Sequence, residues 1–193
     1  MKDIIKKVLA ESIAVKEKFI SGHAEQLIKT ATLLAHCISS GNKIMLFGNG
    51  GSAADAQHIA AEFINRFEIE RRPLPALALT TDTSVITSIG NDYHFDDIFS
   101  KQIQALGKKG DVAVGISTSG NSKNVIKAIN LSKEMGIHTV GLSGPGGRLK
   151  ERADLPLCVD SDSTARIQES HAIAGHILCL LTDRILFPKQ IAR

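Results

Sequence analysis

The sequence has no tryptophan and only one tyrosine, and this scarcity of aromatic residues narrows the choice of partners. Bases of single-stranded nucleic acid usually stack on aromatic rings, and Tyr93 offers little such surface. The 23 Lys and Arg residues against 20 Asp and Glu leave a formal charge of +3 and form no long basic block. We therefore expect no nucleic acid among the partners.

Cysteine and long apolar runs are also scarce. Cys37, Cys158 and Cys179 are too far apart for a Cys-x-x-Cys motif, and such residues are typically buried free thiols in a reducing compartment. Charges interrupt the apolar residues of MKDIIKKVLAESIAVKEKF, so the N-terminus lacks a signal-peptide core. No run approaches the roughly 18 apolar residues of a membrane span. These absences predict a cytoplasmic protein with no membrane partner.

The chain has enough residues and enough apolar side chains to form one hydrophobic core. A chain of 193 residues with 43% hydrophobic content is short for two domains, so we expect residues 1–193 to form a single domain. Apolar residues three and four apart predict two amphipathic helices, Asp3 to Ile20 and Ala24 to Ile38, separated by Ser21 and Gly22. Because the sheet that follows is complete without them, residues 1–40 are expected to lie in subunit interfaces.

From Lys43 the sequence alternates short apolar runs with Gly- and Ser-rich loops and helical segments. The apolar runs are KIMLFG, PALALT, DVAVGIS, IHTVGLS and LPLCV. A long helical stretch from about Thr164 to Phe187 follows them. This alternation predicts an α/β fold, a flavodoxin-like or Rossmann-like sandwich in which a five-stranded parallel sheet has helices on both faces.

The first loop of interest is Gly48-Asn49-Gly50-Gly51-Ser52, which follows the first apolar run. In open parallel sheets, ligands bind at the carboxyl ends of strands, near helix N-termini. Gly48, Gly50 and Ala53 also fit the glycine frame of a dinucleotide site. The acid that would hold a ribose is absent from PALALTT, although Asp82 follows nearby, so we reject that interpretation.

The second loop, Ser117-Thr118-Ser119-Gly120-Asn121-Ser122, follows the third run and opens a helix near Lys123. Its four hydroxyls can surround a phosphate with neutral donors, while the helix N-terminus adds a favourable dipole. An ordinary Ser N-cap would need only one hydroxyl. No Walker-type Gly-Lys-Ser/Thr is present, so the loop predicts a phosphate site but not a nucleoside triphosphate site.

Two helical segments carry polar stripes. In SAADAQHIAAEFINRF the stripe is Asp55, His58, Glu62 and Arg66, and His58 and Glu62 at i and i+4 can reach a common metal ion. Taken alone, such a pair is more often a solvent-facing couple.

The final helix supplies a second stripe. At 100° per residue its members fall within about a 100° sector, and they are Gln168, Glu169, His176 and Asp183. We interpret His171, outside this stripe, as a core or interface histidine.

Four runs together carry a family resemblance: GNGGSAADAQHIAAE, ALTTDTSVITSIGNDYHFDDIFSKQI, GISTSGNSKNVIKAI and TARIQESHAIAGHIL. Over essentially its whole length the chain resembles the bacterial phosphoheptose isomerases of the sugar-isomerase (SIS) domain superfamily. The resemblance implies conversion of D-sedoheptulose 7-phosphate to D-glycero-D-manno-heptose 7-phosphate, for the heptose of the lipopolysaccharide inner core. It also implies a homotetramer with N-terminal helices between subunits, sites at subunit interfaces, and one zinc ion per subunit.

The resemblance also assigns residues. It implies that substrate is bound by Asn49, Gly50, Gly51, Glu62, Asn91, Asp92 and Gln168, and its phosphate end by Ser52, Ser117, Thr118, Ser119 and Ser122. The implied zinc ligands are His58, Glu62, Gln168 and His176, with Glu62 and His176 as the acid/base pair. Ala165 stands where some relatives have Asp, which puts one hydroxyl contact in doubt.

The implied zinc set raises two questions. Gln168 and His176 are eight residues apart, about 12 Å along an ideal helix, so they must extend toward each other or come from different subunits. Glu62 cannot be fully effective as a base while bound tightly to zinc, because the metal lowers its proton affinity. Either the metal shifts when substrate binds, or its role is mostly structural.

Two alternatives are open. The chain also resembles a non-enzymatic SIS-domain protein that binds the bacterial replication initiator, in INRFEIERRPLPALAL and RILFPKQ. From the resemblance, that protein lacks an acid at the Glu62 position and a histidine at the His176 position, and both are present here. The second alternative is an isomerase of another sugar phosphate, which the two loops alone would permit.

Overall fold

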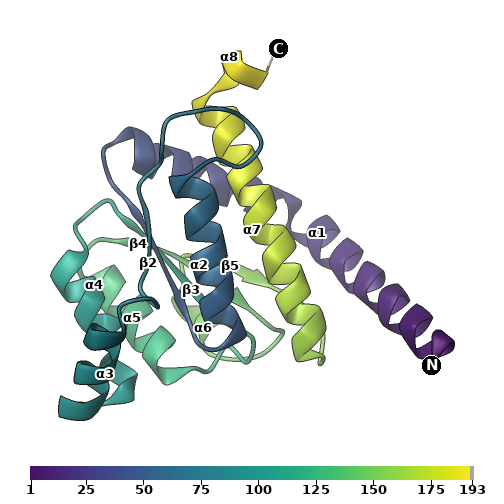
Figure 1. Cartoon of the computed structure of the whole chain (residues 1–193), viewed down its shortest axis with the longest axis horizontal. Coiled ribbons are helices and arrows are strands. Elements are labelled where there is room, and N and C mark those ends of the chain that lie inside the picture. The colour runs from purple at the N-terminus through teal and green to yellow at the C-terminus, as the bar shows by residue number, and fades with distance from the viewer. Residues whose placement is uncertain (192–193) are drawn as a thin grey trace.

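The computed structural model describes residues 1–191, which build a parallel sheet between two layers of helices (Figure 1). The strands are β1 (Ile44–Gly48), β2 (Ala76–Ala78), β3 (Val112–Ser117), β4 (His138–Ser143) and β5 (Leu155–Cys158). Each lies within one of the five predicted apolar runs. All neighbouring strands are parallel, in the order β2-β1-β3-β4-β5, so the predicted α/β fold is confirmed.

Two hydrophobic clusters cover the two faces of the sheet. The first packs the sheet against α1 (Lys2–Ser39), α2 (Gly51–Ile64) and α7 (Thr164–Leu186). The second packs it against α3 (Thr83–Asp92), α4 (Ser100–Leu106), α5 (Lys123–Glu134) and α6 (Leu149–Arg152). A 3-10 turn, η1 (Phe95–Asp97), joins α3 to α4, and α8 (Pro188–Ile191) follows α7. β1 and β3 are buried throughout because both of their faces are covered.

The strand order reverses between β1 and β3. The chain leaves β1 toward β2 on one side and reaches β3 on the other, so the loops that follow β1 and β3 open side by side. Such a switch point is where open α/β sheets bind ligands. The two loops singled out in the sequence are the two that flank it.

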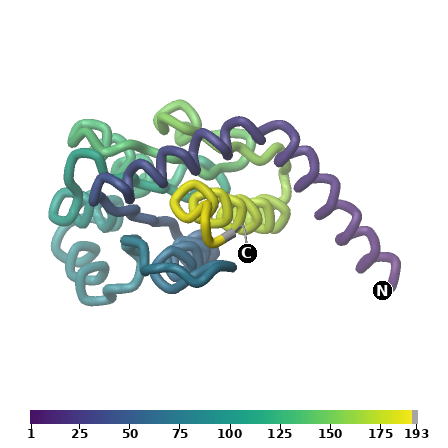
Figure 2. The backbone as a smooth tube through the Cα atoms, turned by 90° about the horizontal axis from the view of Figure 1, so that it is seen from above, coloured from purple at the N-terminus to yellow at the C-terminus, as the bar shows by residue number. Residues whose placement is uncertain are grey.

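The N-terminal region differs from the prediction of two helices. Residues 2–39 form one continuous helix, and Ser21 and Gly22 lie inside it. A glycine in a helix costs only about 1 kcal/mol relative to alanine. Burial of Phe19 on one side and Leu27 on the other outweighs that cost. The N-terminal part of α1, before Ser12, projects away from the rest of the molecule (Figure 2).

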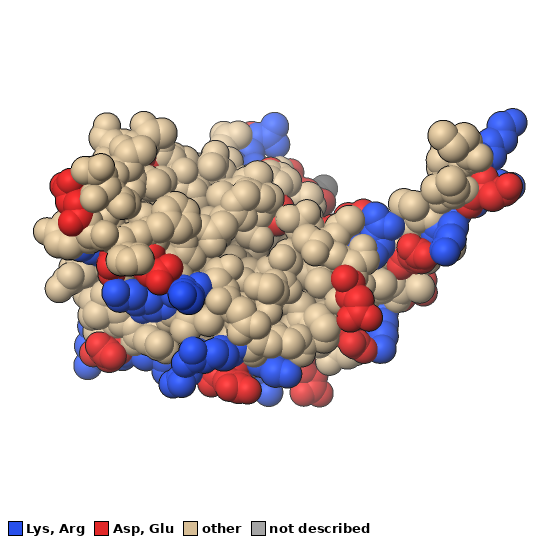
Figure 3. Space-filling model, turned by 90° about the horizontal axis from the view of Figure 1, so that it is seen from below, with Lys and Arg blue, Asp and Glu red and all other residues tan. Residues whose placement is uncertain are grey.

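The surface agrees with the absence of a basic block. On the face that Figure 3 shows, Lys and Arg are interspersed with Asp and Glu. Within the described residues, no helix is both long and apolar enough to cross a membrane. Cys37 and Cys179 are buried as predicted, while Cys158 is only partly buried, and all three are free thiols. Burial raises the pKa of the Cys37 thiol to about 12.

Candidate active site

The predicted phosphate loop turns its hydroxyls toward one another. Ser117 Oγ lies 2.9 Å from Ser122 Oγ and 3.4 Å from Ser119 Oγ. Ser122 is the N-cap residue of α5, yet its side chain makes no cap hydrogen bond, which argues against an ordinary Ser cap. Gly120 has φ +65, so the turn needs a residue without a Cβ. The result is a hydroxyl cluster at the N-terminus of a 12-residue helix, a suitable place for an anion.

Two asparagines tie the loops of the switch point together. Asn49 Nδ2 donates to Asn124 Oδ1, and Asn124 Nδ2 donates back to Asn49 Oδ1, both at 2.9 Å. Asn49 therefore uses its side-chain carbonyl and one amide N–H on this pair and has one amide N–H left for substrate. Asn124, which the sequence interpretation missed, is buried near the start of α5. Its only sequence signal is a polar residue among the apolar positions of that helix.

The glycines of the first loop have packing reasons that do not involve a dinucleotide. A Cβ on Gly48 would lie 2.8 Å from the backbone oxygen of Ile116 in the neighbouring strand. A Cβ on Gly51 would collide with the side-chain amide of Gln168. Gly50 has φ +54 and precedes α2 as its N-cap. The loop is therefore shaped by close contact with β3 and α7.

Helices α2 and α7 run side by side (Figure 1). Their packing brings together three predicted residues: His58 from the middle of α2, Glu62 from its last turn and His176 from the middle of α7. His58 Nε2 lies 3.2 Å from Glu62 Oε1 and 3.4 Å from His176 Nε2. Gly175 permits this approach, because a Cβ there would lie 2.6 Å from Ile59 Cδ1. We call His58, Glu62 and His176 the acid–base cluster.

The acid–base cluster has donor atoms suited to a metal ion. Its three ligand atoms lie within 4.8 Å of one another. Zinc in a tetrahedral site at its usual bond lengths separates its ligands by about 3.3 Å. The separations of 3.2 and 3.4 Å within the cluster are close to that value. Two imidazoles and one carboxylate also form a common zinc donor set.

Gln168, the fourth predicted ligand, lies elsewhere in the chain. Its amide packs against Gly51, at the N-terminal end of α2. Gly51 and His58 are seven residues apart, roughly 10 Å along an ideal helix. The sequence left two possibilities open: Gln168 and His176 extend toward each other, or they come from different subunits. Within one chain, Gln168 and His176 do not extend toward each other.

The remaining predicted substrate contacts fall into two groups. Thr118 is half-buried in the phosphate loop, whereas Ser52 at 4% and Ser117 at 3% are buried and have little surface left for a phosphate. Asn91 and Asp92 end α3 and are exposed, and Asn91 Nδ2 donates to Asp92 Oδ1 at 2.9 Å. This pair lies on the layer opposite α2 and α7.

Asp55 belongs to the predicted stripe, although no role is assigned to it from the sequence. It precedes His58 by almost one turn, and its Oδ2 is buried without a hydrogen-bond partner among the described residues. Burial raises the pKa of this carboxyl, and His58 opposes the shift. Buried polar atoms normally have a hydrogen-bond partner, so Asp55 Oδ2 is an exception that the described residues do not explain.

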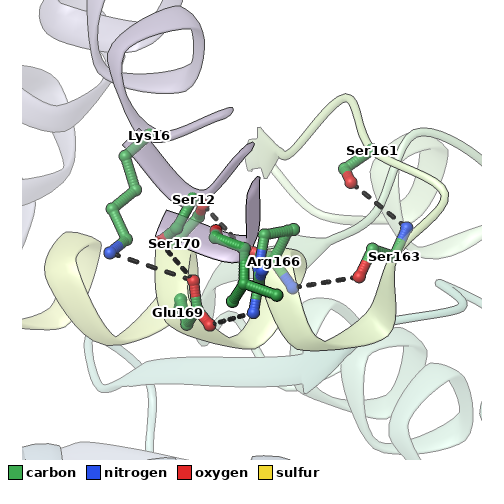
Figure 4. A network of polar contacts seen from close by, with 8 residues as sticks. Ser12, Lys16, Ser161, Ser163, Arg166, Glu169 and Ser170 are labelled. Atoms are coloured by element: carbon green, nitrogen blue, oxygen red, sulfur yellow. Dashed lines mark hydrogen bonds and ion pairs between the residues drawn. The ribbon is translucent and has the colours of Figure 1, made fainter. Parts of the chain in front are cut away.

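Two other polar residues of α7 have structural partners: Glu169, a member of the stripe, and His171, which lies outside it. Glu169 accepts hydrogen bonds from Ser12 Oγ at 2.5 Å and Arg166 Nη2 at 2.6 Å, as Figure 4 shows. These bonds hold the pKa of Glu169 low and anchor α1 to the start of α7. His171 is fully buried and contacts the Ser143 carbonyl through Nε2 at 3.2 Å, so of the two interpretations, core or interface, the core histidine is confirmed.

Comparisons with known proteins identify the family of this chain. Residues 9–144 match the family model described as "SIS domain". A phosphoheptose isomerase from Nitratidesulfovibrio vulgaris (Hildenborough) is 52% identical over 94% of this chain and 88% of its own length. One from Aquifex aeolicus is 49% identical over 96% of this chain and 98% of its own. The structure of phosphoheptose isomerase GmhA from Neisseria gonorrhoeae matches with a TM-score of 0.89 and 45% identity, over 94% of this chain and 98% of that one.

Proposed function

This chain belongs to the phosphoheptose isomerases of the SIS-domain family, and from that membership we propose that it converts D-sedoheptulose 7-phosphate to D-glycero-D-manno-heptose 7-phosphate. It is an aldose–ketose isomerase. The observation that carries the proposal is the acid–base cluster, in which Glu62 and His176 meet at His58 in the same chain as a phosphate loop. The alternative of a replication-initiator binding protein has no comparable support, because such a role needs neither group.

The phosphate loop holds the end of the sugar that does not react. Hydroxyls of Ser119 and Ser122, which contact the buried Ser117 hydroxyl, supply neutral donors, and the N-terminus of α5 supplies the favourable dipole. Binding energy gained there positions the other end of the sugar, where the proton moves.

Isomerisation moves a proton from C1 to C2 through an enediol. In this proposal Glu62 takes the proton from C1 and returns it to C2. His176 delivers a proton to the carbonyl oxygen at C2 and accepts one from the hydroxyl at C1, which leaves an aldehyde. The Phe67 ring lies tilted against the His176 imidazole, with ring centroids 5.4 Å apart and an angle of 36° between the ring planes.

Zinc is the proposed metal, held by His58, Glu62 and His176. When bound, it would stabilise developing negative charge on the sugar oxygens as a Lewis acid. Oε1 is the Glu62 oxygen that faces His58, and a metal bound there would lower the proton affinity of the whole carboxylate, so Glu62 can act as the base only when it is not tightly bound. We propose that Gln168 of a neighbouring subunit supplies the fourth ligand, because Gln168 of the same chain lies at Gly51.

A homotetramer with shared sites is part of the proposal. Apolar side chains near the start of α1 are 42–69% exposed, and they are Ile4, Ile5, Val8, Leu9 and Ile13. Burying them gains on the order of 25 cal/mol per Å² of apolar area. Glu62 also lies eleven residues beyond Gly51, roughly 16 Å along α2, so we propose that the phosphate contacts come from the loop of a neighbouring subunit.

The shared-site proposal is tested by changing Val8 and Ile13 to Asp together. Sedimentation equilibrium should show dissociation, and turnover should fall with it. A folded monomer with full turnover would show that one chain contains a complete site.

A cytoplasmic location is also part of the proposal. Free thiols at Cys37, Cys158 and Cys179 fit a reducing compartment, which supports a cytoplasmic enzyme. The heptose product would then supply the lipopolysaccharide inner core.

Substrate choice provides the test of the function. We expect kcat/KM for sedoheptulose 7-phosphate to exceed the values for fructose 6-phosphate and ribulose 5-phosphate, with chelation lowering turnover and zinc restoring it. A higher kcat/KM for either shorter ketose phosphate would favour another sugar-phosphate isomerase. Turnover unaffected by chelation would remove zinc from the proposal.

A further inference from the structure

A buried ion pair joins the two helices that carry the acid–base cluster. Arg71 lies in the segment after α2, which crosses α7 in Figure 1, and its Nε donates to Asp183 Oδ1 on α7 at 2.7 Å. The side chains of Arg71 and Asp183 are 0% and 4% exposed. Full burial of both charges indicates a fixed contact.

The rest of the Arg71 guanidinium binds the C-terminal end of α2. Nη2 donates to the backbone oxygen of Glu62 at 2.9 Å, and Nη1 donates to that of Phe63 at 2.8 Å. Nη1 also lies 3.1 Å from the Asn65 oxygen. The last carbonyls of a helix have no partner within the helix and carry its negative dipole end. Arg71 thus closes the end of α2 and holds the backbone of the proposed base itself.

Asp183 lies on the same face of α7 as His176. It follows His176 by seven residues, so the two side chains lie on one face of the helix, two turns apart. The Arg71–Asp183 contact therefore fixes the rotation of this face relative to the end of α2 that carries Glu62.

The pair is poorly explained by stability alone. Desolvation of a buried ion pair often offsets its attraction, and apolar side chains of similar volume can serve equally well. Asp183 Oδ2 is also buried without a partner among the described residues, which adds a further cost. Burial raises the pKa of Asp183, and Arg71 opposes the shift.

We propose that Arg71 and Asp183 are positioning residues of the isomerase, setting the separation of Glu62 and His176 across the seam between α2 and α7. The proposal rests on the function proposed above. A displacement of about 1 Å at reacting groups can lower the rate about 100-fold. The phosphate loop follows β3 and contacts neither residue, so phosphate binding should be unaffected.

The test is to measure kcat and KM separately in Asp183→Asn, which keeps the side-chain shape and removes the charge. We expect kcat to fall about 10- to 100-fold, while KM for sedoheptulose 7-phosphate stays within about 2-fold. Arg71→Lys, which keeps the charge and loses the planar fork, should show the same pattern in kcat and KM. Adding Asp183→Glu to Arg71→Lys should recover part of kcat, because the longer acid reaches the shorter base.

Glu70→Gln is the matched control. It removes the exposed Arg66–Glu70 ion pair, at 2.9 Å, one residue before Arg71, and should leave kcat and KM unchanged. Thermal melts give the folded fraction at the assay temperature, and kcat is expressed per folded molecule. If Asp183→Asn or Arg71→Lys lowers the melting temperature but keeps wild-type kcat per folded molecule, the pair serves stability alone and the proposal is wrong. Absence of turnover in the wild-type protein would instead count against the proposed function.

Discussion

The phosphate loop and the acid–base cluster are assembled in opposite ways. The loop is one run of six residues, Ser117 to Ser122, whose hydroxyls face one another through local turn geometry. The cluster joins His58 and His176, which are 118 residues apart, and depends on the packing of α2 against α7. In the loop, several hydroxyls bind the same phosphate. In the cluster, each proton transfer depends on one side chain. Single substitutions should therefore have graded effects in the loop and severe effects in the cluster.

The largest effect is expected at Glu62. Glu62→Gln keeps the shape of the side chain but removes the base, so kcat should fall about 10²- to 10⁴-fold with the fold intact. Steady-state kinetics and circular dichroism measure both quantities. Glu134→Gln, at an exposed glutamate ending α5, is the control and should turn over normally. Near-normal kcat in Glu62→Gln would remove this carboxylate from the mechanism.

A smaller effect, on KM, is expected at Ser119. One hydrogen bond to a charged group contributes roughly 1.5–3 kcal/mol, so Ser119→Ala should raise KM about 10- to 100-fold and change kcat little. Ser39→Ala, at the exposed end of α1, controls for loss of a hydroxyl elsewhere. A silent Ser119→Ala together with a large KM increase in Lys123→Gln would show that a cation, and not the hydroxyls, binds the phosphate.

The sequence could predict the loop because all of its chemistry is local. The five apolar runs were also sufficient to predict the sheet, since strands covered on both faces have unmistakable composition. In the cluster, i and i+4 spacing identified His58 and Glu62, but only packing of α7 on α2 shows that His176 joins them and Gln168 does not. Asn124 and Arg71 escaped notice because their partners, Asn49 and Asp183, are distant in sequence. The predicted break at Gly22 was wrong because tertiary burial on either side overrides a single glycine.

The smallest effect concerns a second histidine on α7. Burial lowers the pKa of His171 from 6.5 to about 4, so the folded protein resists a proton that the unfolded chain accepts. Stability should therefore fall as pH drops from about 6.5 toward 4, by about 1–1.5 kcal/mol at pH 5.5. Urea unfolding of His171→Gln should show a shallower dependence on pH over this range. An identical pH dependence in wild type and variant would mean that His171 is not the buried neutral group described here.

Proton movement in heavy water tests the central claim most directly. Folded, zinc-supplied protein is mixed with sedoheptulose 7-phosphate in D₂O, and proton NMR follows the sugar. An enediol formed by Glu62 and His176 predicts the appearance of an aldoheptose 7-phosphate, which carries deuterium at C2 whenever protonated Glu62 exchanges with D₂O before it returns the proton. The aldose should form far more slowly in Glu62→Gln. If the folded wild-type protein forms no aldose, or Glu62→Gln forms it equally fast, the assignment of the acid–base cluster to this isomerisation is contradicted.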